Sequence, residues 1–376
     1  MPSVLLIGTV ETKQAQIFDI SSALVRHGLS PNVIDISLYT NGTVLSGGAK
    51  LARMAEVASE RARDVAAQAS KAVAAIGLGG GTGGEIAISV LKALPATYSK
   101  FLITTMAFDP RDALADNAIT LVPTLCDIEG LNPMLRQVFE NTAAMVAGLV
   151  NADFSTKSVR PNIAVTTLGA TGEAGINITQ KLNGSGFDTT VFHANGYGGA
   201  ALSRFLTESG AVGFIDLNVH ELGRIRIAGS HVPMPTRFRA ADQLPRVVLP
   251  GALNFLGLGA YETLSEEHLS RPHYQHSNHF THVQLTRSEM AKQAEALAAE
   301  LNYAQAPCHV LIPMGGFSHQ DSPGGAFEAP YLREITADVL EAEARSYTVE
   351  RLADHINAPH TAKAAVDALL ERIPHD

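Results

Sequence analysis

The stretch AVAAIGLGGGTGGEIAIS at residues 72–89 runs from a short apolar segment through a glycine-rich turn into a helical pattern. The apolar segment 72–77 predicts a buried strand, and the spacing over residues 85–93 predicts a helix that Pro95 ends. A strand that leads through a glycine turn into a helix is the repeating unit of α/β proteins with a parallel sheet. This stretch therefore indicates the fold class.

The same succession recurs on both sides of this stretch. Toward the N-terminus we expect a strand at residues 3–7 and a helix at residues 14–27. After a polar segment at residues 151–161, the succession restarts with a strand at residues 162–167. Strands that alternate with helices imply a mostly parallel sheet that is covered on both faces.

The polar segment also predicts a domain boundary. We predict an α/β fold of two Rossmann-like, doubly wound domains, residues 1–157 and 158–376, with mostly parallel sheets and an interdomain cleft. In such sheets the ligand lies beyond the carboxyl ends of the strands. The loops at these ends are therefore the first candidates for function.

The composition excludes several classes of protein. Hydrophobic residues make up 46% and charged residues 17% of the 376 positions, which suits a buried core and excludes a disordered chain. The formal net charge of -9 argues against a general nucleic-acid binder. No apolar run approaches the length of a membrane span, and Cys126 and Cys308 alone make no disulfide scaffold. The opening residues lack the charged region of a signal peptide, so we expect a cytoplasmic protein without nucleic-acid or membrane partners.

The glycine-rich turn is the strongest candidate for ligand binding. Gly79, Gly80, Gly81 and Gly83 let the backbone approach a phosphate closely, and Thr82 adds a hydroxyl. The turn is not a Walker A loop, because the GKS or GKT ending is missing. The alternative is a turn that only packs the helix close to the sheet.

A second candidate loop is GTVETK at residues 8–13, which follows the first predicted strand. Gly8 permits a tight turn, the hydroxyls of Thr9 and Thr12 are suited to an anion, and Lys13 supplies a positive charge. The alternative is an ordinary capping turn with a solvated lysine.

Two loops of the second domain, residues 169–173 and residues 192–199, form a third candidate. They include Gly196, Gly198 and Gly199 in the turn ANGYGG, and His193 at the end of the preceding strand. The glycines could contact a ligand, and His193 is a candidate for proton transfer. The alternatives are a plain turn and a half-buried, hydrogen-bonded histidine.

Further polar residues have both a structural and a catalytic or metal-binding interpretation. Asp216 and Glu221 could act as an acid–base pair or bind a metal, but helix capping and a surface pair are favoured. His319 and Asp321, next to Ser318, are too close in sequence to form a hydrolytic triad, so a binding loop is favoured there.

A run of histidines follows at a spacing of three residues. In an extended segment this spacing would align the imidazoles on one face, which could hold Zn²⁺. A polar, solvated connection is favoured instead, and no metal site is predicted. The run comprises His273, His276, His279 and His282, preceded by His268.

Taken in order, the motifs resemble those of the family of tomato mosaic virus resistance protein-like ATP-binding domains. The resemblance spans residues 4–372. It rests on nine dispersed motifs, namely GTVETK, GLGGGTGG, CDIEGLNPMLRQVFENTAAMVAGLV, VTTLGATGEAG, VFHANGYGG, GFIDLNVHEL, PGALNFLGLGAYE, LIPMGGFSHQDSPGGAF and DHINAP.

The resemblance implies two Rossmann-like subdomains, ATP as the ligand with or without Mg²⁺, and a homo-oligomer, dimer or higher. It also implies a separate barrel-domain protein as a candidate partner, since the plant member carries such a domain after this region. Carried over by motif, the candidate ligand residues are Gly8, Thr9, Thr12, Lys13, residues 79–83, His193, Gly196, Gly198, Gly199 and Glu221.

Three functions are therefore open. The first is a nucleotide-binding protein that holds the phosphates at its glycine-rich loops. The second is a metabolic enzyme that acts on a small phosphorylated or carboxylated substrate in the interdomain cleft, with acid–base groups among His193, Glu221, His319 and Asp321. The third is a binding or scaffold protein with nucleotide as a structural ligand.

Overall fold

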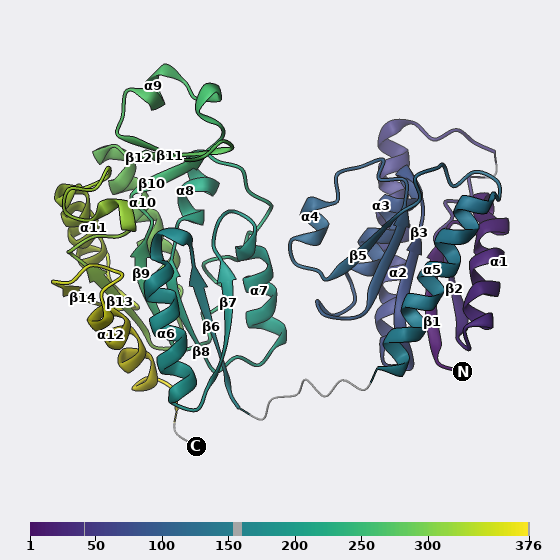
Figure 1. Ribbon diagram of the computed structural model, residues 1–376, viewed down its shortest axis with the longest axis horizontal. Helices are drawn as coiled ribbons and strands as arrows, with labels where there is room; N and C mark the ends of the chain where they lie inside the picture. Colours follow the sequence, from purple (N-terminus) through teal and green to yellow (C-terminus); the bar gives the residue numbers. More distant parts are fainter. Residues whose placement is uncertain (41, 153–159, 375–376) are drawn as a thin grey trace. The chain divides into compact units, whose positions relative to one another are not determined.

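The computed structural model describes residues 1–40, 42–152 and 160–374. The chain separates into two compact units, Met1–Thr156 and Lys157–Asp376. Each unit is built on a large parallel sheet with helices on both faces, which confirms the predicted α/β class (Figure 1). No helix in the described part of the chain combines the length and the apolar composition needed to cross a membrane.

The first unit has a five-stranded sheet in the order β2-β1-β3-β4-β5, and every neighbouring pair is parallel. Its strands are β1 (Ser3–Gly8), β2 (Ser30–Asp35), β3 (Ala72–Leu78), β4 (Lys100–Thr104) and β5 (Ile119–Pro123). Its helices are α1 (Val10–Arg26), α2 (Gly47–Gln68), α3 (Gly81–Leu91), α4 (Arg111–Leu114) and α5 (Pro133–Asn151).

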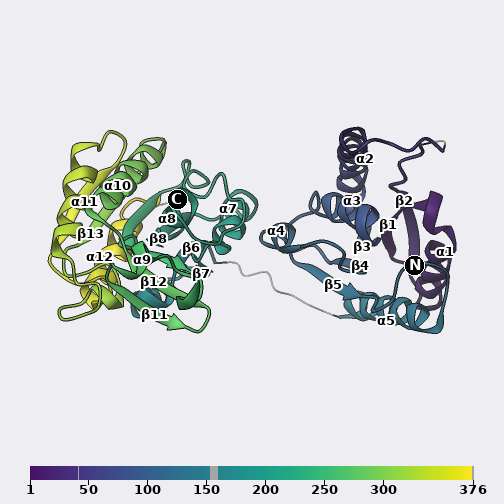
Figure 2. The same cartoon turned by 90° about the horizontal axis from the view of Figure 1, so that it is seen from above.

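The alternation of side chains along β1 explains why this sheet is buried on both faces. Val4 and Leu6 pack with α1 and α5, whereas Leu5 and Ile7 pack with α2 and α3. All four side chains are fully buried, because successive residues of a strand point to opposite faces. Figure 2 shows α5 and the pair α2 and α3 on opposite sides of the sheet.

The second unit has a six-stranded parallel sheet in the order β14-β13-β9-β8-β6-β7. Its strands are β6 (Asn162–Thr167), β7 (Asp188–His193), β8 (Gly213–Asn218), β9 (Arg246–Gly251), β13 (Cys308–Pro313) and β14 (Thr348–Leu352). Its helices are α6 (Gly172–Gly184), α7 (Gly198–Glu208), α8 (Glu221–Arg226), α9 (Glu266–Leu269), α10 (Arg287–Leu301), α11 (Pro330–Ala342) and α12 (Pro359–Leu370).

A small antiparallel sheet in the second unit was not predicted from the sequence. It has the order β10-β12-β11 and consists of β10 (Phe255–Leu258), β11 (His273–Ser277) and β12 (Phe280–Gln284). The histidine run thus lies in a hairpin rather than in a solvated connection, and Tyr274 pairs with His282 across it. Pairing with β10 covers one edge of β12, which local sequence does not reveal.

The glycine-rich turn also differs in one respect from its prediction. The helix α3 begins at Gly81 rather than at residue 85. Glycines carry no side chain that could mark a helical pattern, so the sequence pattern places the start of the helix too late in the chain. As a result, half of the predicted turn is the first turn of α3.

Candidate functional site

Both large sheets have their topological switch point at corresponding strands. In the first unit the connection after β1 leads to β2 on one side of the sheet, and the connection after β3 leads to β4 on the other side. In the second unit the connections after β6 and β8 diverge in the same way, to β7 and β9. A crevice at the carboxyl ends of such strands is the usual ligand position in open α/β sheets. Each unit has a pocket there.

The pocket of the first unit, called here the glycine-loop pocket, has a volume of about 450 Å³. It combines the loops after β1, β2 and β3 with the segment that precedes α5. The residues that line it are Thr9, Glu11, Thr12, Lys13, Ser37, Leu38, Thr40, residues 79–83, Ile86, Asp127 and Ile128.

The first turn of α3 presents unused backbone donors to the glycine-loop pocket. In the described residues, no side chain caps α3, and the amides of Gly81, Thr82 and Gly83 have no acceptor. The first amides of a helix lack a partner within the helix and carry its positive dipole end. Three such donors that line one pocket form a cradle suited to an anion.

The neighbouring helix α1 differs, because its first amides are already occupied. The amide of Val10 donates to Asp35 Oδ1 at 3.0 Å, and that of Glu11 donates to Ser37 Oγ at 2.9 Å. Burial alone would raise the pKa of Asp35, but hydrogen bonds from Ser37, Tyr39 and the Val10 amide outweigh burial and lower it. Asp35 is thus an ionised cap of α1, and the unused backbone donors are those of α3.

Side chains of the GTVETK loop complete the cradle. Thr9 and Thr12 share a hydrogen bond of 2.9 Å between their hydroxyls. Lys13 Nζ lies 3.0 Å from Glu129 Oε2, and the Glu129 side chain is 80% exposed. An ion pair with so exposed a carboxylate contributes little, so an anion in the pocket can compete for Lys13.

At two of the predicted ligand-binding glycines, close packing also explains why the residue has no side chain. A Cβ on Gly79 would lie 2.4 Å from the Gly83 carbonyl carbon, and a Cβ on Gly8 would lie 3.1 Å from Ile17 Cδ1. Gly8 is buried and does not line the glycine-loop pocket. Its expected ligand contact thus stays a prediction, whereas Gly79 both lines the pocket and requires the absence of a side chain.

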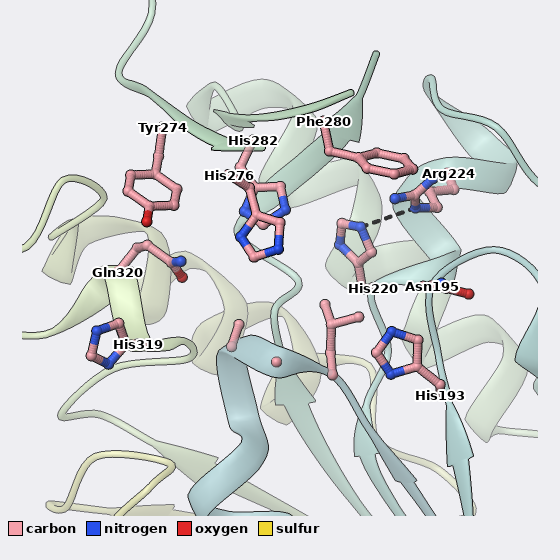
Figure 3. Close-up of a pocket in the computed structure, with 13 residues that line it drawn as sticks. His193, Asn195, His220, Arg224, Tyr274, His276, Phe280, His282, His319 and Gln320 are labelled. Atoms are coloured by element: carbon pink, nitrogen blue, oxygen red, sulfur yellow. Dashed lines mark hydrogen bonds between the residues drawn. The ribbon is translucent and has the colours of Figure 1, made fainter. Parts of the chain in front are cut away.

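The pocket of the second unit, called here the histidine pocket, has a volume of about 400 Å³. Loops after β6, β7, β8 and β13 form its floor and walls, and the hairpin of β11 and β12 covers it (Figure 3). The residues that line it are Leu168, Gly169, Ala170, His193, Asn195, His220, Arg224, Tyr274, His276, Phe280, His282, His319 and Gln320.

Two histidines of this pocket are held in the neutral form. Burial, together with the charge of Arg224, lowers the pKa of His220 to about 3. Burial and the neighbouring His276 lower the pKa of His282 to about 4. His220 Nδ1 lies 3.0 Å from the Ala252 carbonyl, and Nε2 accepts from Arg224 Nε at 3.1 Å. These partners require the tautomer with the proton on Nδ1.

Profiles of a known family match both units of the chain. The Uncharacterised protein family (UPF0261) N-terminal domain matches residues 44–155, and the Uncharacterised protein family (UPF0261) C-terminal domain matches residues 160–373. The chain belongs to the UPF0261 family. The family resemblance inferred from the motifs is thereby confirmed.

Relatives in this UPF0261 family include full-length matches. A UPF0261 protein of Mesorhizobium japonicum is 30% identical, and the alignment covers all of both chains. A UPF0261 protein of Brucella suis is 26% identical over 97% of this chain and 94% of the relative. The ToMV resistance protein Tm-1 of tomato is 29% identical over 80% of this chain but only 41% of its own length.

The favoured surface pair of Asp216 and Glu221 is wrong for this UPF0261 chain. Both carboxylates are buried and bind the buried Arg237, with Nε 2.6 Å from Glu221 Oε2 and Nη1 2.9 Å from Asp216 Oδ2. Burial alone would lower the pKa of Arg237, but the two carboxylates outweigh burial and raise it. Glu221 has a structural role in this network and does not line the histidine pocket, so its expected part in proton transfer stays a prediction.

The turn at residues 195–199 is organised by the same carboxylate. The amides of Gly196 and Gly199 donate to Glu221 Oε1 at 2.9 and 3.0 Å. A Cβ on Gly199 would lie 2.3 Å from Glu221 Oε2, and one on Gly198 would lie 2.2 Å from the His193 carbonyl oxygen. These three glycines are closely packed and do not line the histidine pocket, so their expected ligand contact stays a prediction.

The two candidates in the loop after β13, Asp321 and His319, have different environments. Asp321 is buried and binds Arg333 Nη1 at 2.5 Å and the amides of Phe317 and Ala329, so it has no free oxygen for acid–base work. His319 lines the histidine pocket together with His193, and both are exposed to it. His193 and His319 thus line the same pocket, from opposite sides (Figure 3), whereas Asp321 and Glu221 do not line it.

Only part of the histidine run lines the histidine pocket. His276 and His282 stack in parallel at 5.0 Å between ring centroids and line the pocket, whereas His273 and His279 do not. Within the described residues, no group of three His, Cys, Asp or Glu side chains is placed to hold a metal ion. No sequence motif singled out His220 or Arg224, although both follow β8 and therefore lie at a strand end.

The neutral histidines predict a loss of stability of the second unit in acid. In the unfolded chain both take up protons below about pH 6.5, whereas in the folded chain they do so only near pH 3 and 4. Their contribution is complete above pH 6.5 and declines as the pH falls, by about 2 kcal/mol for each histidine at pH 5. Urea unfolding of the full chain between pH 5 and 8 measures this loss.

A matched pair of variants on the hairpin assigns the acid effect. His282→Gln should flatten the dependence of stability on pH, whereas His279→Gln, at an exposed position of the same hairpin, should leave it unchanged. An equal pH dependence in the wild type and His282→Gln would exclude His282 as a source of the effect.

Proposed function

We propose that the first unit binds a nucleotide, with its phosphates on the first turn of α3. The observation that carries this proposal is a set of three backbone donors at Gly81, Thr82 and Gly83 that find no acceptor among the described residues and line the same pocket as Lys13. Backbone amides and a lysine are the partners that phosphate groups take at other strand-to-helix turns.

The remaining walls of the glycine-loop pocket fit the rest of a nucleotide. Leu38, Ile86 and Ile128 are apolar and suit the face of a base. Glu11 and Asp127 are acidic and suit ribose hydroxyls or a Mg²⁺ bound to the phosphates. Together with the resemblance to ATP-binding domains, this chemistry favours ATP. The homo-oligomer, the barrel-domain partner and the cytoplasmic location stay predictions.

Calorimetric titration of the full chain with ATP, ADP, AMP and adenosine, with and without Mg²⁺, tests the proposal. Affinity should rise with the number of phosphates, and adenosine should bind weakly. Lys13→Ala should lower the ATP affinity about tenfold, because a charge-assisted contact is lost. No binding at millimolar ATP, or adenosine binding as tightly as ATP, would contradict the proposal.

A further inference from the structure

The second unit contains one buried arginine that differs from the others. Four arginines of this unit are buried, namely Arg224, Arg237, Arg246 and Arg333. Arg237, Arg246 and Arg333 each have a carboxylate within 4 Å. In the described part of the chain, Arg224 has none.

The donors of Arg224 are only partly used. Its Nε donates to His220 Nε2 at 3.1 Å, and Nη1 donates to the Ser230 carbonyl at 2.9 Å. Nη2 has no acceptor among the described residues. The negative charge of Glu221 acts on Arg224 from a distance, but the Glu221 carboxylate forms its ion pair with Arg237. Burial lowers the pKa of Arg224, and the opposing charges of Glu221 and Tyr197 do not offset this effect. A buried cation without a counter-ion is costly unless an anion joins it.

Two further polar atoms around the histidine pocket lack partners. His282 Nδ1 and Gln320 Oε1 are buried and have no hydrogen-bond partner among the described residues. Both side chains line the same pocket as Arg224, and Figure 3 shows them around one hollow. Buried polar atoms in folded proteins are nearly always satisfied, so two such atoms beside the unused Nη2 of Arg224 around one cavity indicate a missing polar ligand.

We propose that the histidine pocket binds a small hydroxylated organic anion. Its carboxylate or phosphate group pairs with Arg224, and its hydroxyl groups bond His282 and Gln320. The apolar side chains of Leu168 and Phe280 cover its carbon skeleton. A cation is disfavoured because Arg224 would repel it. This site belongs to the second unit and does not depend on nucleotide binding by the first.

Thermal unfolding of the full chain in the presence of named anions tests the proposal. The probes are malate, tartrate, gluconate, glycerol 3-phosphate and inorganic phosphate at 20 mM or above (roughly a hundredfold over a Kd near 0.2 mM), with glycerol as the neutral control. At least one hydroxylated anion should raise the Tm of the wild type by about 3 °C or more, and glycerol should not. The carboxylate and phosphate arms show which anionic group Arg224 prefers.

Three variants assign the shift to the histidine pocket. Arg224→Met should abolish it, and Arg224→Lys, which keeps the charge, should retain part of it. Gly81→Asp, which alters the glycine-loop pocket, should retain all of it, so that anions bound in the first unit are recognised separately. Far-UV circular dichroism confirms that each variant is folded.

The hydroxyl contacts have their own readout. Malate and succinate differ only by one hydroxyl group, so the wild type should bind malate about tenfold more tightly. Gln320→Leu should reduce that preference without abolishing binding. The proposal is overturned if no hydroxylated anion of the panel stabilises the wild type, or if Arg224→Met retains the full shift.

Discussion

Replacement of Arg237 by methionine is expected to lower the free energy of unfolding of the second unit by about 3–5 kcal/mol. The guanidinium is fully buried and bonds Glu221 and both oxygens of Asp216, at 2.6 to 2.9 Å. Methionine fills a similar volume but leaves two buried carboxylates without a counter-ion. The loss should also release the turn at residues 195–199, because Glu221 holds two of its amides. Urea denaturation followed by circular dichroism measures the change.

A neighbouring arginine supplies the control for this prediction. Arg239 bonds Glu300 at 2.7 Å, but its side chain is 43% exposed. Arg239→Met should therefore cost about 1 kcal/mol or less. If Arg237→Met costs no more than Arg239→Met, the buried network does not stabilise the second unit. Adding Asp216→Asn to Arg237→Met should recover part of the loss, since one uncompensated charge is removed.

Replacement of Gly81 by aspartate is expected to lower the affinity for ATP by at least about thirtyfold without destabilising the first unit. Apart from its chain neighbours and the backbone of its own helical turn, no atom of the described residues lies within 4 Å of a Cβ placed on Gly81, so the side chain fits. An acidic residue in the first turn of α3 favours the helix dipole. The same carboxylate repels a phosphate on that turn by about 4 kcal/mol at an effective dielectric constant of 20 and a separation of 4 Å. Calorimetry gives the affinity, and thermal unfolding gives the stability.

Gly81→Asn separates charge from size in this test. Asparagine has nearly the same shape as aspartate but carries no charge, so it should retain most of the ATP affinity. An equal loss in both variants would show that bulk, and not anion binding, accounts for the effect. Retention of full affinity in Gly81→Asp would place the phosphates away from α3.

Much of the fold could be predicted from local sequence. The parallel α/β class follows from apolar segments that alternate with helical spacing, as at residues 3–7 and 14–27, because both periodicities are local. The residues of the glycine-loop pocket were largely predicted as well. Thr9, Thr12, Lys13 and residues 79–83 follow two strands that are neighbours in the sheet, so their loops meet at one edge.

The second unit was harder to predict because its site depends on distant contacts. Asp216 and Glu221 were assigned to the surface, since nothing near them in sequence indicates that Arg237 lies between them. The hairpin of β11 and β12 brings His276 and His282 to the ends of strands that precede it by many residues. The spacing of three residues between the histidines does not indicate that this segment pairs with itself as a hairpin.

The sequence by itself determined the succession of strands and helices, the glycine turns at the strand ends and the membership of the family. These features depend on residues that are close along the chain. Only the tertiary structure decided which polar groups are buried and which of them have partners. Arg224 and Arg237 are the same residue type, but Arg224 has no counter-ion in the part of the chain that the structure describes, whereas Arg237 has two. That difference arises because charge compensation depends on the distance in space, and the chain folds residues far apart in sequence into the same interior.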